Sequence, residues 1–257
     1  MMKTAYQLLK TDIFKFVRYS LFNNVINKMV WVVCSVLVAL YIWPSMGMSA
    51  NFCVFLGVGA IVSCIFWDCW DVSVQFIADL DGNNITQYYL SLPIPAPWFF
   101  VKQAIFYAIR ALIPALCILP LIKLILWNKL NLIQVHWLLF AVVMFSTCFF
   151  GATLSLFITS RVKDMNSIDN ISMRFLFPIW FFGGGQFSWY TLYGIAPVIA
   201  KISLINPLLY AMESMHVVFL GQQGYLPFWP SIGVLWVFNI AIGAYGAWSL
   251  MRRLDCV

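Results

Sequence analysis

The 257 residues of this chain are 63% hydrophobic and only 9% charged, whereas soluble domains average about 25% charged residues. This composition excludes an ordinary soluble protein and predicts an all-α polytopic membrane protein, with residues 1–257 forming one domain. The net charge of +6 therefore bears on orientation and on membrane lipids as partners, and we expect no nucleic-acid partner.

Residues 3–22 are predicted to form a basic amphipathic helix, which is the main part of an N-terminal segment 1–24. Its apolar face consists of Leu9, Ile13, Phe16 and Val17. Its polar face consists of Lys3, Gln7, Thr11, Lys15 and Arg18. A helix of this kind lies in the membrane interface and favours anionic lipid. We expect Asn23 and Asn24 to bend the chain into the bilayer.

Six apolar segments are predicted to be membrane spans, because a bilayer needs ~20 apolar residues. They cover about 25–43, 52–77, 98–127, 132–159, 171–182 and 230–251, and the fifth is short and contains Pro178. Spans one to five thus occupy residues 25–182.

Lysine and arginine are expected on the cytosolic side of the membrane. With a cytosolic N-terminus, eleven of them fall in inner segments: Lys3, Lys10, Lys15, Arg18, Lys28, Lys102, Arg161, Lys163, Arg174, Arg252 and Arg253. Three fall outside: Lys123, Lys129 and Lys201. We therefore expect a multi-pass protein of the inner (plasma) membrane with both termini in the cytosol.

A polar interruption between spans two and three is predicted to hold a short helix over 81–93. Its candidate caps are Asp81, Asn83 and Asn84, whose side-chain oxygens accept first-turn N–H groups. Its apolar face has helical spacing and consists of Ile85, Tyr88, Tyr89 and Leu92. Pro93 and Pro95 end it. The helix either presents this face to another protein or lies on the surface without a partner.

Residues 183–229 are too apolar for an exposed loop and too interrupted for a span. Two short helices are expected over 187–201 and 207–220. Irregular backbone inside a membrane is tolerated only against protein or a water-filled cavity. The helices therefore either dip into the outer leaflet and roof a pathway, or lie flat on the outer face.

Arg110 lies inside the third span, where a charge costs roughly 2.5–3.5 kcal/mol on insertion scales. It is expected to pair with a carboxylate of the antiparallel second span, which offers Asp68 and Asp71. Asp68 fits better by depth. Arg110 would otherwise snorkel to the interface or contact a substrate.

Two further patterns have competing interpretations. Glu213 and His216 are spaced i, i+3, but a carboxylate metal site needs more such steps, so we expect a polar helix face and no metal. Aromatic residues crowd the outer end at 180–182, 187–193 and 228–229. They form either an interfacial belt or a stacking surface for an amphipathic or sugar-bearing substrate.

The order of these parts resembles the permease subunit of a type-2 ABC transporter, of the exporter class, over nearly the whole chain. One similar stretch runs from Asp81 and Gly82 through 89–95 (YLSLPIP) to Lys102. It is similar to the acidic–Gly, Leu-Leu, Pro-Ile/Val and Gly-Lys run of the family. The chain departs from that run at Gln103, where glycine is usual.

A second stretch is similar to the family's span-five proline, small-residue turn and Ile-Ser-x-x-Asn-Pro signature. It consists of Pro178, Gly183, Gly184, Pro197, 202–205 (ISLI), Asn206 and Pro207. Glu213 stands where the family commonly has arginine.

The resemblance implies that the 81–93 helix is a coupling helix that docks into an ATPase subunit, braced by the N-terminal helix. A homodimer of this chain would pair with two ATPase copies, which would bind ATP and Mg. No GxxxxGK[ST] loop occurs, so the chain itself is expected to be non-catalytic and without a cofactor. The expected cargo is hydrophobic or amphipathic: a lipid, a glycolipid or a drug-like molecule. The alternative is a stand-alone channel, scramblase or assembly factor without an ATPase.

Overall fold

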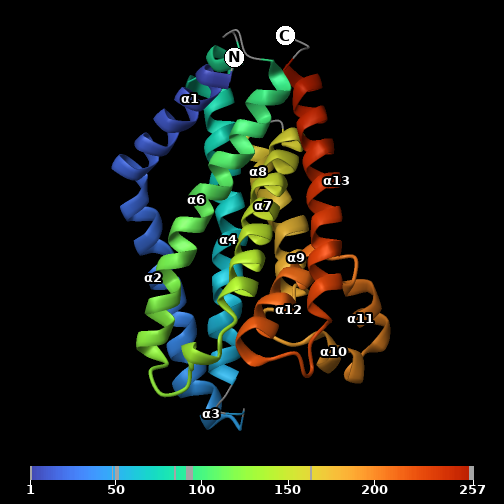
Figure 1. The fold of residues 1–257 in the computed structure, drawn as a ribbon. Coiled ribbons are helices and arrows are strands. Elements are labelled where there is room, and N and C mark those ends of the chain that lie inside the picture. Colours follow the sequence, from blue (N-terminus) through green and yellow to red (C-terminus); the bar gives the residue numbers. More distant parts are fainter. Residues whose placement is uncertain are drawn as a thin grey trace.

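Long apolar helices run side by side along most of the molecule (Figure 1). The structure is a computed structural model and describes residues 2–47, 49, 52–83, 85–90, 95–162 and 164–254. Among these residues, five helices are long and apolar enough to cross a membrane: Tyr6–Ser45, Phe52–Ala78, Pro97–Ile125, Trp137–Arg161 and Phe228–Leu254. By helix length and hydropathy, the chain is a multi-pass membrane protein.

The first of these helices is continuous and longer than expected. It comprises α1 (Met2–Lys15), the π-helical turn η1 (Phe16–Ser20), α2 (Leu21–Leu37), η2 (Val38–Ile42) and α3 (Trp43–Ser45). The bend predicted at Asn23 and Asn24 does not interrupt the helix, because both residues lie inside α2. The apolar face predicted for the N-terminal helix also differs from the structure at Val17. Phe16 is buried and Val17 is 49% exposed, since a π-helical turn departs from the 3.6-residue period.

The next three long helices follow the predicted spans closely. They are α4 (Phe52–Ala78), extended by the π-helical turn η3 (Asp79–Asn83), then α6 (Ala96–Ile125) and α7 (Trp137–Arg161). The short helix α5 (Ile85–Leu90) lies between α4 and α6, and the single turn η4 (Leu132–Gln134) precedes α7. Residues 132–136, expected inside the fourth span, thus form a turn and extended backbone that connect α6 to α7.

The segment predicted as the fifth span is not among the helices long enough to count as one. It forms α8 (Met165–Ile171), the π-helical turn η5 (Ser172–Leu176) and α9 (Phe177–Phe181). Trp180 at its end donates to Ser63 Oγ in the middle of α4 at 3.1 Å. The segment therefore returns from the end of α7 only as far as the interior of the bundle, where a glycine turn stops it.

The remaining helices are α10 (Trp189–Ile195), α11 (Pro197–Ser203), α12 (Pro207–Leu220) and the last long helix, α13 (Phe228–Leu254). The predicted helix over 187–201 is broken, because Ala196 precedes a proline and leaves the α region with φ −141° and ψ 81°. Helices α11 and α12 meet at 97° and form either a broken span or a re-entrant pair, which makes a possible sixth span.

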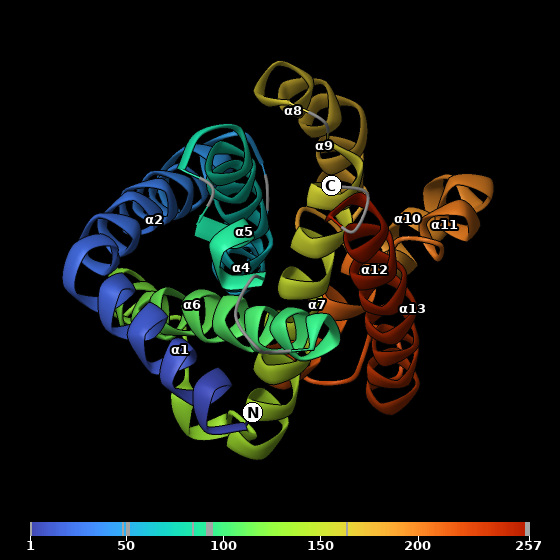
Figure 2. The same ribbon diagram turned by 90° about the horizontal axis from the view of Figure 1, so that it is seen from above.

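Helices α4 and α7 form the centre of the bundle. A Cβ on Gly151 of α7 would lie 3.2 Å from the Ile65 carbonyl oxygen of α4, so the two backbones pack closely. Seen from above, α1 and α2 lie on one side of this centre and α10 and α11 on the other (Figure 2). The start of α1 and the end of α13 lie at the same end of the bundle (Figure 1). We call this the inner end and the opposite one the outer end.

Candidate functional site

The start of α5 is held by a carboxylate from the end of α4. Asp79 Oδ1 accepts from the Ile85 N–H at 3.0 Å, and Oδ2 accepts from the N–H and the hydroxyl of Thr86 at 2.8 and 2.6 Å. These are the first-turn groups that a cap satisfies. The sequence predicted a cap from Asp81, Asn83 or Asn84, but in the structure Asp79 caps α5. Residues 79–83 form the π-helical turn η3, which brings Asp79 to the start of α5.

The predicted apolar face of α5 divides between solvent and protein. Ile85 and Tyr88 are 46% and 63% exposed. Tyr89 is half-buried, and its ring centroid lies 6.5 Å from that of Phe99. Burial raises the pKa of Tyr89, and so does the neighbouring carboxylate of Asp12. Gly82 is exposed, and the side chain of Asp81 lies outside the described part, as do Asn84, Leu92 and Pro93.

One ion pair joins α1, α5 and α6. Lys102 of α6 is 5% exposed and lies 2.6 Å from Asp12 Oδ2 of α1. Its ammonium also lies 5.4 Å from the Tyr89 ring and 5.1 Å from the Phe99 ring, within cation–π range. Sequence reasoning identified Lys102 through the family resemblance but missed Asp12, which is a single acid in a helix otherwise judged basic.

A buried charge cluster joins three long helices. Asp68 of α4 is 1% exposed and forms an ion pair with Lys28 of α2. Its second oxygen lies 3.6 Å from Arg110 Nε of α6. Asn24 Nδ2 donates to Asp68 at 3.2 Å, and Arg110 donates to Gln75 at 2.6 Å.

The structure thus brings the predicted residues Asp68 and Arg110 together and adds a partner that the sequence analysis placed elsewhere. Lys28 was counted among the cytosolic charges, but it is buried at 9% exposure and paired inside the bundle. A signal was present, because Lys28 is a lone charge in an apolar segment, as Arg110 is.

At the outer end, Glu213 of α12 clamps two other segments. Its carboxylate accepts from the Trp189 N–H at 2.7 Å, at the start of α10, and from the Leu226 N–H at 2.9 Å. The residue is fully buried. Its two oxygens therefore satisfy backbone donors of two half-buried residues. The sequence could not predict this contact, because both donors are backbone N–H groups.

The other predicted outer residues gather around the start of α12. Pro178, Asn206 and Pro207 line one apolar cavity of about 660 Å³. Asn206 donates to the Ile179 carbonyl at 2.6 Å, which ties α12 to α9.

Glycines and Pro197 shape the neighbouring backbone. A Cβ on Gly183 would lie 2.8 Å from Leu208, and Gly184 has φ +80°, which favours glycine. Pro197 begins α11 on the exposed side and does not line that cavity.

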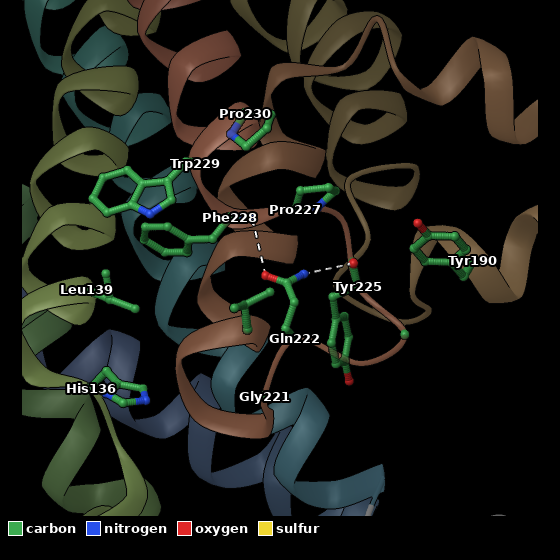
Figure 3. A pocket seen from close by; sticks show the side chains of 12 residues that line it. His136, Leu139, Tyr190, Gly221, Gln222, Tyr225, Pro227, Phe228, Trp229 and Pro230 are labelled. Atoms are coloured by element: carbon green, nitrogen blue, oxygen red, sulfur yellow. Dashed lines mark hydrogen bonds between the residues drawn. The ribbon is translucent and has the colours of Figure 1, made fainter.

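A second outer cavity of about 910 Å³ is lined by Tyr190, Tyr225 and Trp229 together with His136 and Gln222 (Figure 3). Gln222 is occupied with its own loop: its amide donates to the Tyr225 and Leu226 carbonyls at 3.1 and 2.9 Å and accepts from the Phe228 N–H. Burial raises the pKa of Tyr225 to about 12, with a contribution from Glu213. The cavity thus offers aromatic rings and few unused polar groups.

His216 does not point to the same partners as Glu213. Its Nε2 lies 3.1 Å from the Phe55 carbonyl oxygen, and its ring stacks on Phe55 at 3.9 Å between centroids. Within the residues that the structure describes, no three His, Cys, Asp or Glu side chains are grouped to hold a metal ion. Glu213 thus attaches two backbone segments, and His216 packs on Phe55.

Comparison with known proteins gives no family: no family model matches the chain, and no curated protein is similar to it. The findings show a helical membrane protein with five candidate spans and a bent pair among the described residues.

Proposed function

We propose that this chain is the non-catalytic membrane subunit of an ATP-driven exporter of the type-2 ABC class. In this proposal α5 is the coupling helix, which docks into a groove of a separate ATPase subunit. The observation that carries it is the combination of exposure and attachment in α5. Ile85 and Tyr88 are exposed as anchors for helix-in-groove recognition, while Asp79, Thr86 and Tyr89 fix the helix to its neighbours.

The attachments give α5 three mechanical connections to the membrane part. Asp79 is continuous with α4 through η3 and bonds the first turn of α5. Tyr89 contacts Lys102 of α6, and Lys102 in turn bonds Asp12 of α1. A displacement of α5 by a partner would therefore act on α4, α6 and α1 together.

The rest of the assembly follows from the resemblance. Two copies of this chain would form a homodimer with two ATPase subunits, which bind ATP and Mg. Both termini and α5 would be cytosolic, in the inner membrane. The chain would cross six times, five times through the long helices and once through α8, η5 and α9 continued by the outer segment. A hydrophobic or amphipathic cargo (lipid, glycolipid or drug-like) would move outward by alternating access.

The outer segment would roof the cargo path as a re-entrant pair. This is supported by the 97° bend between α11 and α12 and by the burial of α12 along most of its length. A helix that lay flat on the outer face would keep one side exposed. The aromatic cavity of Figure 3 lies beside this segment.

One observation favours the alternative, a stand-alone channel, scramblase or assembly factor. The described apolar surface of α5 that is open to a partner consists of Ile85 and Tyr88 alone, which is small for a stable docking site. The two functions differ in whether this surface must be covered by another protein.

Co-purification with the candidate ATPase subunit separates them. The informative variant is Ile85→Asp with Tyr88→Asp, since both side chains are exposed and their replacement leaves the Asp79 cap intact. The matched control is Ile133→Asp, an apolar residue 94% exposed in the α6–α7 connection at the outer end. We expect the wild type and the control to retain the ATPase and the double variant to lose it. Equal capture by all three would remove α5 as the docking site, and capture by none of them would favour the stand-alone function.

A further inference from the structure

A cavity of about 590 Å³ lies near the inner end, between η1, α4, α5 and α6. Arg110 and Gln75 line its deep part, and Asp12, Asp79 and Tyr89 line the part nearest α5. Lys102 and Arg110 are eight residues apart on α6, so the deep part is ~12 Å further into the bundle. The lining residues come from α1, η1, α4, η3, α5 and α6, and Figure 2 shows how the helices α1, α4, α5 and α6 are arranged when seen from above.

The acidic groups of the cavity are already satisfied by protein partners. Asp12 pairs with Lys102, and both oxygens of Asp79 accept hydrogen bonds from α5. Asp68, behind the cavity wall, pairs with Lys28 and accepts from Asn24. Asp71 is half-buried on α4 and does not line the cavity.

Arg110 is the cation that this arrangement leaves incompletely paired. Its guanidinium is buried at 4% exposure, yet Nε has no hydrogen-bond partner and lies 3.6 Å from Asp68, whose other oxygen is held by Lys28. Its guanidinium donates to Gln75 at 2.6 Å and lies 5.5 Å from the centroid of the Phe16 ring. Lys15, which is exposed and lines the same cavity, adds a second positive charge. An anion entering the cavity would therefore meet two positive charges, the Arg110 guanidinium and the Lys15 ammonium.

The walls and the mouth of the cavity indicate what carries that anion. Phe16, Phe76 and Phe106 line the interior, and Tyr19 and Ser20 line an exposed edge on η1. Exposed Phe14 and Val17 flank this edge on the basic amphipathic helix, where membrane lipid is expected. The edge is formed by a π-helical turn, a departure from α-helix that often occurs at functional sites.

We propose that this cavity binds the phosphate group of a membrane lipid, with Arg110 as the residue that holds the phosphate. Guanidinium groups bind phosphate through paired N–H···O bonds, which suits a buried, cavity-lining arginine that makes one side-chain hydrogen bond among the described residues. The acyl chains would leave past Tyr19 and Ser20 toward the bilayer. The site does not depend on an ATPase partner, and it holds whether the lipid is cargo or a permanent component.

The test is lipid binding to the purified full chain in detergent, measured by native mass spectrometry. The probes are a short-chain phosphatidylglycerol, the diacylglycerol with the same chains, and inorganic phosphate as a competitor. We expect phosphatidylglycerol to bind and diacylglycerol to bind much more weakly. We expect Arg110→Gln to weaken phosphatidylglycerol binding by roughly 10- to 100-fold, because the variant loses charge-assisted hydrogen bonds to the phosphate.

The matched control is Arg161→Gln, which removes the same charge from the exposed end of α7, outside the cavity. Ser20→Trp narrows the exposed edge and leaves the charge cluster intact, so it tests the site even if Arg110→Gln does not fold. The proposal is overturned if diacylglycerol binds equally well or if the folded variants keep wild-type affinity. Displacement of the lipid by an equal concentration of inorganic phosphate would also overturn it, since the site would then take free phosphate.

Discussion

The inner and outer ends of the bundle are held together by different kinds of contact. At the inner end, charged side chains connect separate helices, as Lys102 does with Asp12 and Lys28 with Asp68. At the outer end, α12 is buried along most of its length, and Glu213 bonds backbone groups of two neighbouring segments. Breaking a contact at the inner end leaves a buried charge without its partner, whereas breaking the Glu213 contacts leaves backbone N–H groups without their acceptor. The inner end therefore depends on several pairs of charged side chains, and the outer end depends on one carboxylate that holds two backbone segments.

The largest effect is expected from removing the centre of the inner charge cluster. Asp68→Asn leaves Lys28 and Arg110 buried without a carboxylate, which costs about 3–5 kcal/mol for a broken buried pair. Thermal unfolding in detergent should show a large loss of stability. Asp169→Asn, at an exposed acid on α8, is the control and should unfold like the wild type. Lys28→Met should destabilise more than Arg110→Met, because Lys28 is the closer partner; the reverse order would show that Arg110 is the principal one.

The next effect concerns the outer clamp. Glu213→Ala leaves the Trp189 and Leu226 N–H groups without their acceptor, at about 1–3 kcal/mol for each buried group. Release of α10 and α11 should make exposed Lys201 more accessible to trypsin. Limited proteolysis followed by mass spectrometry would detect cleavage after Lys201. Unchanged cleavage would mean that packing alone holds this segment and that the two ends differ less than their contacts indicate.

A smaller effect is expected where α13 packs on α7. A Cβ on Gly246 would lie 2.8 Å from the Phe157 backbone nitrogen, so Gly246→Ala should destabilise by about 1–3 kcal/mol through overpacking. Gly233 on the same helix has open space around the position of a Cβ. Gly233→Ala should therefore be neutral or slightly stabilising. Similar melting temperatures for both variants would contradict the close approach of the two helices.

The smallest effect is a pH dependence at the outer loop. The pKa of Tyr225 is raised from 10.0 to about 12 in the folded protein, which therefore holds this proton more tightly than the unfolded chain. The resulting stabilisation is fully present below pH 10 and is lost as the pH rises from about 10 to about 12. Tyr225→Phe should reduce the slope of unfolding free energy against pH in that range and change little at neutral pH. An unchanged slope would mean that other tyrosines cause the pH dependence in this range.

The long helices could be predicted from the sequence because each one is an apolar segment of about the length a bilayer requires. The interruptions were harder. Pro197 breaks the helix predicted over 187–201 through the residue before it, and η1 shifts Val17 away from the face of Phe16. Both effects are local departures from a regular 3.6-residue period, which a periodicity argument assumes.

Of the candidate site residues, the sequence predicts a contact only where two opposite charges lie in neighbouring apolar helices, because each buried charge needs a partner of opposite sign. Asp68 and Arg110 lie at similar depths in antiparallel helices, so their pairing could be predicted. Lys28 also lies in an apolar helix, but it was assigned to the cytosolic surface. Asp79 and Glu213 could not be found in this way. Their partners are backbone N–H groups, which every residue except proline carries, so the identity of the partner leaves no trace in the sequence.

The continuous first helix connects the membrane surface mechanically to the interior of the bundle. Its 40 residues would span ~60 Å if straight, about twice the hydrocarbon thickness of a bilayer. One arm, α1, ends beside α5 through Asp12, and the other arm, α2, carries Lys28 to the buried cluster, with η1 between them. Lys28 lies about ten residues, or ~15 Å, from the middle of η1, so a tilt of about 10° at η1 would displace it by about 2–3 Å. A rotation of α1 at the membrane surface would thus disturb the ion pair of Lys28 with Asp68 inside the bundle.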